Sequence, residues 1–283
     1  MSGPRPTLRC PCAGSHLVEA FAYDAPPAGE TRFDLGRGTY ARAYDRCSLC
    51  GHWFARHELD VGRLYEHAYV DATYGGPAGM RARMERILAL PPENSDNAGR
   101  VGRLLAFAAT HVPRRPAALR LLDVGAGIGV FPAAMKAAGW AVVAVEPDPR
   151  TAAHLRDTAG VEAHAVPITS HELERIGRFD VVTFNKVLEH VEDPVEMLVA
   201  ARRLLAPDGF VYVEVPDAEA AAPHGPGREE FFLEHHHVFS PASLALMGAR
   251  GGLSAIALER LREPSGKFTL RGFFALSVHE PDA

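Results

Sequence analysis

Residues 121–131 read LLDVGAGIGVF, and this stretch decides the fold class. An apolar strand-like run leads directly into three alternating glycines, Gly125, Gly127 and Gly129, and an apolar segment of helical character follows. Glycine lets the backbone turn sharply and approach a ligand without an intervening Cβ atom. A strand, a glycine turn and a helix in this order predict a ligand-binding βα unit of an α/β protein.

The spacing of the glycines separates two classes of ligand. In a dinucleotide fingerprint the third glycine falls at position 130, which is Val130 here, and the chain instead has the spacing GxGxG. Asp123 stands two residues before Gly125, and Glu146 ends the next strand-like run. An acid at that place accepts hydrogen bonds from the hydroxyls of an adenosine ribose. A nicotinamide oxidoreductase stays as the alternative, although about 165 residues from Leu119 onward leave little room for a separate catalytic domain.

The chain around the glycine turn alternates β-rich runs with Ala/Leu-rich segments, which is the α/β pattern. We expect about seven strands, at residues 119–124, 141–145, 161–166, 180–185, 210–215, 253–261 and 268–277. We expect helices at residues 130–138, 149–158, 170–176 and 194–205. Upstream, Ser95, Asp96 and Asn97 are candidate N-caps of a further helix that ends before Pro113.

Three motifs together resemble the class I S-adenosylmethionine (SAM)-dependent methyltransferases. The first is DxGxGxG with Glu146 behind it. The second is FDVVTFNKVLEHVEDP at residues 179–194, which is similar to that family's fourth-strand motif. The third is LLAPDGFVYV at residues 204–213, which is similar to its turn into the fifth strand. The resemblance covers residues 119–215 in the family's order and implies a Rossmann-like sheet.

The resemblance also implies a cofactor site. Its residues would be Asp123, Gly125, Ala126, Gly127, Glu146 and Asn185. The glycines would pack against SAM, Glu146 would hold the ribose, and Asp123 and Asn185 would lie near the methionine end. The structural alternatives are a simple turn at Gly125, a solvated strand end at Glu146 and a purely structural role for Asn185 at the end of its strand.

All four cysteines lie in two pairs near the N-terminus, Cys10/Cys12 and Cys47/Cys50. Four thiolates satisfy tetrahedral zinc, so we expect a structural zinc site. The first pair is irregular because a single residue separates its members, and His16 or His52 lies close enough to replace a ligand. Free buried cysteines are the alternative, and a redox pair is disfavoured because no thioredoxin-like βαβ context surrounds Cys47.

A cysteine knuckle before such a core resembles bacterial methyltransferases with an N-terminal zinc-binding domain, including sugar C-methyltransferases of deoxysugar pathways. This resemblance implies a zinc-binding lid domain at residues 1–75, a helical connector at 76–118, and a methyltransferase domain at 119–283. A substrate-binding insertion would lie near 216–243. From the sequence we expect no counterpart of the long second C-terminal domain of the best-known members.

The insertion carries LEHHHVFS at residues 233–240, where the sugar C-methyltransferases have HEHxxYFS. The resemblance makes His235 a candidate general base, with Glu234 orienting it. His190 is a second candidate, and Tyr69 of a tyrosine-rich loop is a candidate donor to a substrate oxygen. The alternatives are polar groups satisfied within loops, packing for Tyr69, and a second metal held by His235 and His237.

Composition and charge limit the classes of partner that we expect for the chain. The formal net charge is -5, so a nucleic-acid partner is not expected. No signal segment and no apolar run of about 18 residues occurs, so we expect a cytoplasmic protein without a membrane partner. We therefore expect a SAM-dependent methyltransferase acting on a small polar acceptor. A sugar or nucleotide sugar is the favoured class of acceptor. O- and C-methylation both stay open, and so do a small-molecule O-methyltransferase of another pathway and a non-catalytic SAM-binding zinc scaffold.

Overall fold

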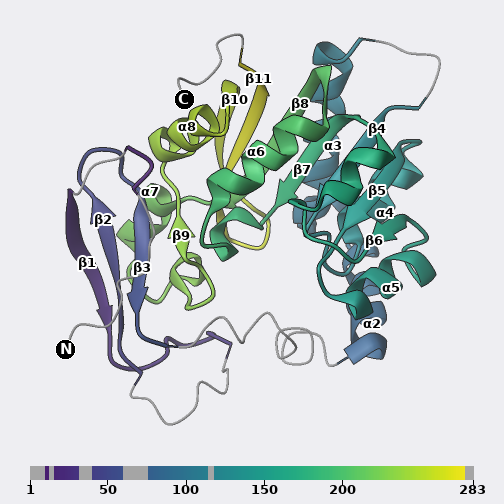
Figure 1. Ribbon diagram of the computed structural model, residues 1–283. Helices are drawn as coiled ribbons and strands as arrows, with labels where there is room; N and C mark the ends of the chain where they lie inside the picture. Colours follow the sequence, from purple (N-terminus) through teal and green to yellow (C-terminus); the bar gives the residue numbers. More distant parts are fainter. Residues whose placement is uncertain (1–9, 13–15, 32–39, 60–75, 114–117, 278–283) are drawn as a thin grey trace.

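The computed structural model describes residues 10–12, 16–31, 40–59, 76–113 and 118–277 (Figure 1). Two sheets lie side by side in it. The smaller sheet is built mainly from the N-terminal residues, and the larger sheet belongs to the chain from residue 118 onward. Within these ranges, no helix is both long enough and apolar enough to cross a membrane.

The larger sheet has seven strands in the described part of the chain, which confirms the predicted α/β class. They are β4 (Arg120–Val124), β5 (Ala141–Val145), β6 (Glu162–His164), β7 (Phe179–Asn185), β8 (Leu205–Pro216), β10 (Leu253–Arg262) and β11 (Phe268–Leu276). Their order across the sheet is β10-β11-β8-β7-β4-β5-β6. The first five in sequence pair in parallel, whereas β11 pairs antiparallel with both β8 and β10.

Two elements differ from the prediction by more than one or two residues at their ends or by their type. β8 begins at Leu205 rather than at Phe210, because Leu205 already pairs with Phe179 and an irregularity in register follows before Phe210. That irregularity absorbs the Pro-Asp-Gly residues that the sequence places before the strand. The predicted helix at 170–176 forms instead as the 3₁₀ helix η3 (His171–Ile176).

Helices cover both faces of the larger sheet. They are α2 (Gly76–Leu88), α3 (Asp96–His111), α4 (Val130–Ala137), α5 (Pro149–Asp157), α6 (Pro194–Leu204) and α8 (Pro241–Arg250). Successive strand residues point to opposite faces. On β7, Val182 and Phe184 belong to the apolar cluster that includes α6 and α8. Val181 belongs to the cluster that includes α3, α4 and α5. The helix predicted after Ser95 is therefore part of the packing of the larger sheet.

Side-chain caps fix where the helices begin. The Ser95 hydroxyl accepts a hydrogen bond from Ala98 N, as its position before the apolar periodicity predicts. Asp148 caps α5 and Asp193 caps α6, each directly before a proline at the first helical position. Ser240 and Ser243 form a reciprocal capping box at the start of α8.

The N-terminal region is more regular than its loop-rich composition predicts. β1 (Leu17–Tyr23), β2 (Arg42–Cys47) and β3 (Trp53–His57) form an antiparallel sheet, and β9 (His237–Val238) joins its edge beside β3 (Figure 1). Tyr44 and Trp53 pack there with Phe231 of the 3₁₀ helix η6 (Glu229–Phe231) and with α7 (Ala218–Ala221). The segment that follows β8 therefore joins the two sheets.

The order of the strands creates a switch point. From β4 the chain continues outward through β5 and β6, and then returns to place β7 on the other side of β4. In sheets of this kind, ligands bind outside the carboxyl ends of the strands at such a point. The glycine turn after β4 and the loop after β7 both begin there.

Two helical glycines allow a matched test of this packing. Gly102 in α3 has open space at the place of a Cβ atom, whereas a Cβ on Gly248 in α8 would lie 2.5 Å from Phe274 Cε1. We expect Gly102→Ala to raise the free energy of unfolding by about 0.5–1 kcal/mol. Gly248→Ala should lower it by about 1–3 kcal/mol through overpacking. Urea unfolding measures both, and equal effects of the two substitutions would contradict the packing of α8 on β11.

Candidate functional site

The glycine turn adopts conformations that other residues avoid. Gly125, Gly127 and Gly129 have φ values of 64°, 51° and 81°. A Cβ atom on Gly125 would lie 2.8 Å from Val187 Cγ2, and one on Gly129 would lie 2.8 Å from Ala159 Cβ. The turn therefore requires glycine both for its backbone angles and for its close approach to neighbouring loops.

A cavity of about 840 Å³ lies at this turn. All six residues that the sequence assigns to the cofactor line it, namely Asp123, Gly125, Ala126, Gly127, Glu146 and Asn185. Arg100, Lys186 and His190 also line it. The predicted cofactor residues, which come from three strands, are thus brought to one place.

Glu146 supports the glycine turn from the end of β5. Its Oε2 accepts a hydrogen bond from Gly127 N at 3.1 Å. Burial raises the pKa of this carboxyl above its ordinary value, and the hydrogen bond from Gly127 opposes that rise. The acid expected to hold a ribose therefore stands at the cavity wall, in contact with the loop that would hold the rest of the same ligand.

Asp123 joins β4 to β7. Its Oδ1 accepts hydrogen bonds from Thr183 Oγ1 at 2.7 Å and from Asn185 Nδ2 at 2.8 Å. Burial raises the pKa of Asp123 to about 7, although both hydrogen bonds favour the charged form. Asp123 consequently acts on the site partly by fixing the amide of Asn185.

His190, which lines the cavity, packs against His235. His190 ends the 3₁₀ helix η4 (Leu188–His190), and its Nδ1–H donates to Glu234 O at 2.9 Å. His235 Nδ1–H donates to Glu230 O at 2.9 Å. The two rings meet edge to face with centroids 4.8 Å apart. Because a carbonyl oxygen only accepts, each neutral ring keeps its lone pair on Nε2.

Both rings are held in the neutral form. Burial lowers the pKa of His190 and lowers that of His235 well below its ordinary value. A neutral imidazole whose Nε2 carries no proton is able to accept one. The orienting partner of His235 is the main chain of Glu230 rather than the Glu234 carboxylate that the sequence indicates. Glu234 instead orients His190 through its carbonyl.

Glu189 is a neighbour that sequence reasoning missed. It is 1% exposed, its Oε2 has no hydrogen-bond partner in the described structure, and burial raises its pKa to about 7. One ligand atom each from Glu189, His190 and His235 lie within 4.8 Å of one another. The sequence signal that could have identified Glu189 is its position directly before His190 in the motif after β7.

The second metal predicted at His235 and His237 is not supported. His237 lies in β9, where its Nδ1 meets His52 Nε2 at 2.9 Å and its Nε2–H donates to Glu192 O at 3.3 Å. His52 Nδ1 meets Ser243 Oγ at 3.0 Å. Both rings are thus used in a buried chain of hydrogen bonds, and His52 has no ring nitrogen left to replace a cysteine ligand.

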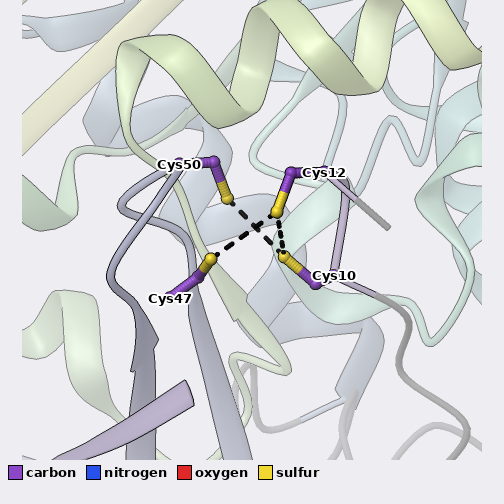
Figure 2. A group of neighbouring side chains, drawn as sticks. All are labelled: Cys10, Cys12, Cys47 and Cys50. Carbon is purple, nitrogen blue, oxygen red and sulfur yellow. Dashed lines mark hydrogen bonds between the residues drawn. The ribbon is translucent and has the colours of Figure 1, made fainter. Parts of the chain in front are cut away.

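The four cysteines converge from two separate segments (Figure 2). The Sγ atoms of Cys10 and Cys12 are 2.9 Å apart, those of Cys10 and Cys50 are 3.7 Å apart, and those of Cys12 and Cys47 are 3.6 Å apart. All four thiols are free, and none of these separations is a disulfide bond. The predicted quartet therefore forms. Tyr69 lies outside the described residues, as do its neighbours Tyr65 and Tyr74.

Curated relatives share the name ubiquinone biosynthesis O-methyltransferase. The protein of Caulobacter sp. (strain K31) is 42% identical over 100 residues, which are 34% of this chain and 40% of that protein. The protein of Bordetella avium (strain 197N) is 30% identical over 164 residues, which are 52% of this chain and 63% of that protein. The chain thus spans less than two thirds of the length of either relative.

Solved structures share the fold. A 1,6-didemethyltoxoflavin-N1-methyltransferase of Burkholderia thailandensis has a TM-score of 0.53 at 20% identity, covering 80% of this chain and 96% of that one. A magnesium protoporphyrin IX methyltransferase of Synechocystis PCC 6803 has a TM-score of 0.54 at 13% identity, covering 75% of this chain and 100% of that one. At these identities the likeness shows the fold alone.

The sequence model of the family described as "Methyltransferase domain" matches residues 86–258, which include the glycine turn, the acid of β5 and the loop after β7. That match extends over more than half of the chain, and the chain therefore belongs to this methyltransferase family.

Proposed function

We propose that the chain transfers the methyl group of SAM to a small polar acceptor. The observation that carries this proposal is the single cavity in which the six cofactor residues face His190. His190 in turn packs against His235, so a cofactor pocket adjoins two neutral imidazoles. A pocket for an activated methyl donor beside proton-accepting groups suits acceptors that must lose a proton.

The first acceptor class is a sugar or nucleotide sugar, methylated on oxygen or carbon. It follows from the sequence resemblance to methyltransferases with an N-terminal cysteine knuckle. A contact of the N-terminal sheet with His235 supports it, because the Tyr44 hydroxyl donates to His235 O at 2.7 Å. The second class is a hydroxyl of another small molecule. The O-methyltransferase names of the curated relatives favour it.

For methyl transfer from SAM, the protein mainly has to align the acceptor with the methyl group and remove the acceptor's proton. SAM, when bound, supplies a methyl group already activated by its sulfonium. His235 Nε2 would take the proton from the acceptor, because Nδ1 is committed to Glu230 O. His190 would lie between that base and the cofactor pocket, with its own Nδ1 held by Glu234 O.

The cofactor assignment is tested by Glu146→Ala. The substitution removes a charged acceptor of hydrogen bonds, each worth about 1.5–3 kcal/mol. We expect the affinity for S-adenosylhomocysteine in calorimetry to fall roughly 10- to 100-fold. Glu162→Ala, on the exposed surface of β6, is the matched control and should bind normally. Measurable NAD binding without SAM binding would overturn the assignment.

The base is tested by His235→Ala in an assay that couples the release of S-adenosylhomocysteine to a colour change. Nucleotide deoxysugar ketones, sugars and catechols form the acceptor panel. We expect turnover to fall about 10²- to 10⁴-fold, with cofactor affinity nearly unchanged. His171→Ala, at a side chain that is 83% exposed, is the control. Cofactor binding without methylation of any acceptor would favour the non-catalytic scaffold.

We also propose that the cysteine quartet binds a structural zinc ion. Zinc–sulfur bonds of about 2.3 Å in a tetrahedron place the sulfurs about 3.8 Å apart. Two of the three close separations, 3.6 and 3.7 Å, agree with this, and the short Cys10–Cys12 contact belongs to the irregular pair. Four soft sulfur donors suit zinc. Such an ion would tie the N-terminal residues to the turn before β3.

Metal analysis of the freshly purified chain tests this proposal. We expect about one zinc ion per chain, and we expect Cys47→Ser to lose it and to lower the thermal midpoint. His16→Ala is the matched control, because His16 is an exposed residue close to the quartet in sequence. Metal-free wild type, or loss of zinc in His16→Ala, contradicts a ligand set of four cysteines.

A further inference from the structure

Lys186 is the cavity residue whose role the proposed function leaves open. It directly follows β7 and has a φ of 60°, and it is the one non-glycine residue with positive φ in the described ranges. Left-handed backbone is unfavourable for a residue with a Cβ atom. Such conformations persist where the surroundings enforce them, and they gather at functional sites.

Both neighbours of Lys186 fix this conformation. Asn185 is tied to Asp123, and Val187 packs against Gly125. Lys186 N itself donates to Glu214 O at 2.9 Å. The backbone that carries the lysine is therefore locked to the cofactor loop.

The lysine side chain reaches β11. Its Nζ donates to Thr269 Oγ1 at 2.9 Å, and Thr269 is fully buried. An ammonium group has three N–H donors, and this bond uses one of them. Lys186 also lines the cavity, so the residue stands where a bound acceptor would lie.

Charged side chains from several elements surround Lys186. Arg100, which also lines the cavity, pairs with the buried carboxylate of Glu214, and Arg271 lies 3.4 Å from the same group. Burial opposes ionisation of Glu214, yet Arg100 holds its pKa well below the usual range. Burial raises the pKa values of Glu189 and Glu263, which favours their neutral forms. Burial also lowers the pKa of Lys186, and the charges of Glu214 and Glu189 oppose that shift and favour its ammonium form.

We propose that Lys186 stabilises the acceptor oxygen as that oxygen gains negative charge during methyl transfer. The inference rests on the proposed function and deepens it. The acceptor O–H, or the C–H beside a carbonyl, gives its proton to His235 Nε2. The electron pair left behind makes the oxygen an alkoxide or enolate, which Lys186 holds. The nucleophilic oxygen or carbon then forms its bond to the methyl carbon, and the carbon–sulfur bond breaks to release S-adenosylhomocysteine.

This assignment narrows the acceptor class. An amine gains positive charge as it is methylated, and a nearby ammonium group repels it. A hydroxyl or an enolisable ketone develops negative charge, and the same ammonium group attracts it. The site is therefore built for an acceptor that reacts as an oxyanion.

The rival is a metal ion held by Glu189, His190 and His235, whose ligand atoms cluster within 4.8 Å. The charge of Lys186 acts on all three groups. A resident ammonium group disfavours a second cation beside it. The lysine supplies the positive charge that a metal ion would otherwise bring to the acceptor.

The first experiment needs no turnover. 4-Nitrophenol, which changes colour on ionisation, is titrated into wild type and Lys186→Gly, each saturated with S-adenosylhomocysteine. Glycine adopts the φ of position 186 without strain, so the variant keeps the backbone and removes the side chain together with its ammonium group. We expect the bound phenol to ionise about ten times more readily in wild type. Equal ionisation in both proteins, or no saturable binding to wild type, overturns the proposal.

The second experiment uses an acceptor found in the panel above. We expect Lys186→Gly to lower kcat about 10²- to 10³-fold, with cofactor affinity retained and with partial rescue by added methylammonium. Lys267→Ala, at a half-exposed lysine paired with Glu229, should keep full activity. Loss of cofactor affinity would move Lys186 to the methionine end of SAM. Full activity of Lys186→Gly that disappears with a chelator would assign the role to a metal ion.

The two experiments distinguish a failure of the proposed function from a failure of the proposed role of Lys186. If wild type methylates nothing, the proposed function is wrong, while the phenol titration still decides whether Lys186 stabilises an oxyanion. If wild type turns over and Lys186→Gly loses kcat and the thermal midpoint together, without rescue by methylammonium, the lysine is structural and the proposal fails.

Discussion

The site depends on one buried carboxylate at the switch point of the sheet. Asp123 accepts hydrogen bonds from Thr183 and Asn185, and so it joins β4 to β7 where their two loops diverge. The glycine turn begins two residues after Asp123, and the loop that carries Lys186 and His190 begins at Asn185. Val187 then packs into the space that Gly125 leaves by having no side chain. The cofactor loop and the acceptor loop are therefore positioned by the same few contacts.

The N-terminal sheet contributes to the site through the main chain of His236. Ala55 N of β3 donates to His236 O, and His236 N donates to Glu189 O at 2.7 Å. His235, one residue earlier, is thus placed by contacts of its neighbour with β3 and with η4. The buried chain from Ser243 through His52 and His237 to Glu192 runs beside it. Because His52 follows Cys50 by two residues, the cysteine quartet helps to hold this chain of hydrogen bonds in place.

The features that the sequence predicted correctly are those that local interactions determine. The glycine turn, the helix caps and the alternation of strands follow from residues close together in the chain, and the structure places them accordingly. The N-terminal strands were missed because the region around them has the composition of loops, and β9 reaches β3 from some 180 residues away, as the pairing of Trp53 with Val238 shows. The partners of His235 and His237 depend on how loops close over one another. No periodicity encodes that Glu230 rather than Glu234 orients His235, or that His237 faces His52.

The two halves of the cavity are built on different principles. The cofactor side relies on main-chain groups and glycines, whose positions follow from backbone geometry. The acceptor side relies on side chains, which need support to hold one position. At Lys186 a left-handed backbone, costing about 1–2 kcal/mol relative to glycine, is imposed by contacts of Asn185 and Val187 with the cofactor loop. The direction of the lysine side chain is thereby set by the cofactor loop, and the hydrogen bond to Thr269 fixes its end. A charge held in this way needs no reorganisation when an oxyanion forms, and this is the condition under which electrostatic stabilisation is most effective.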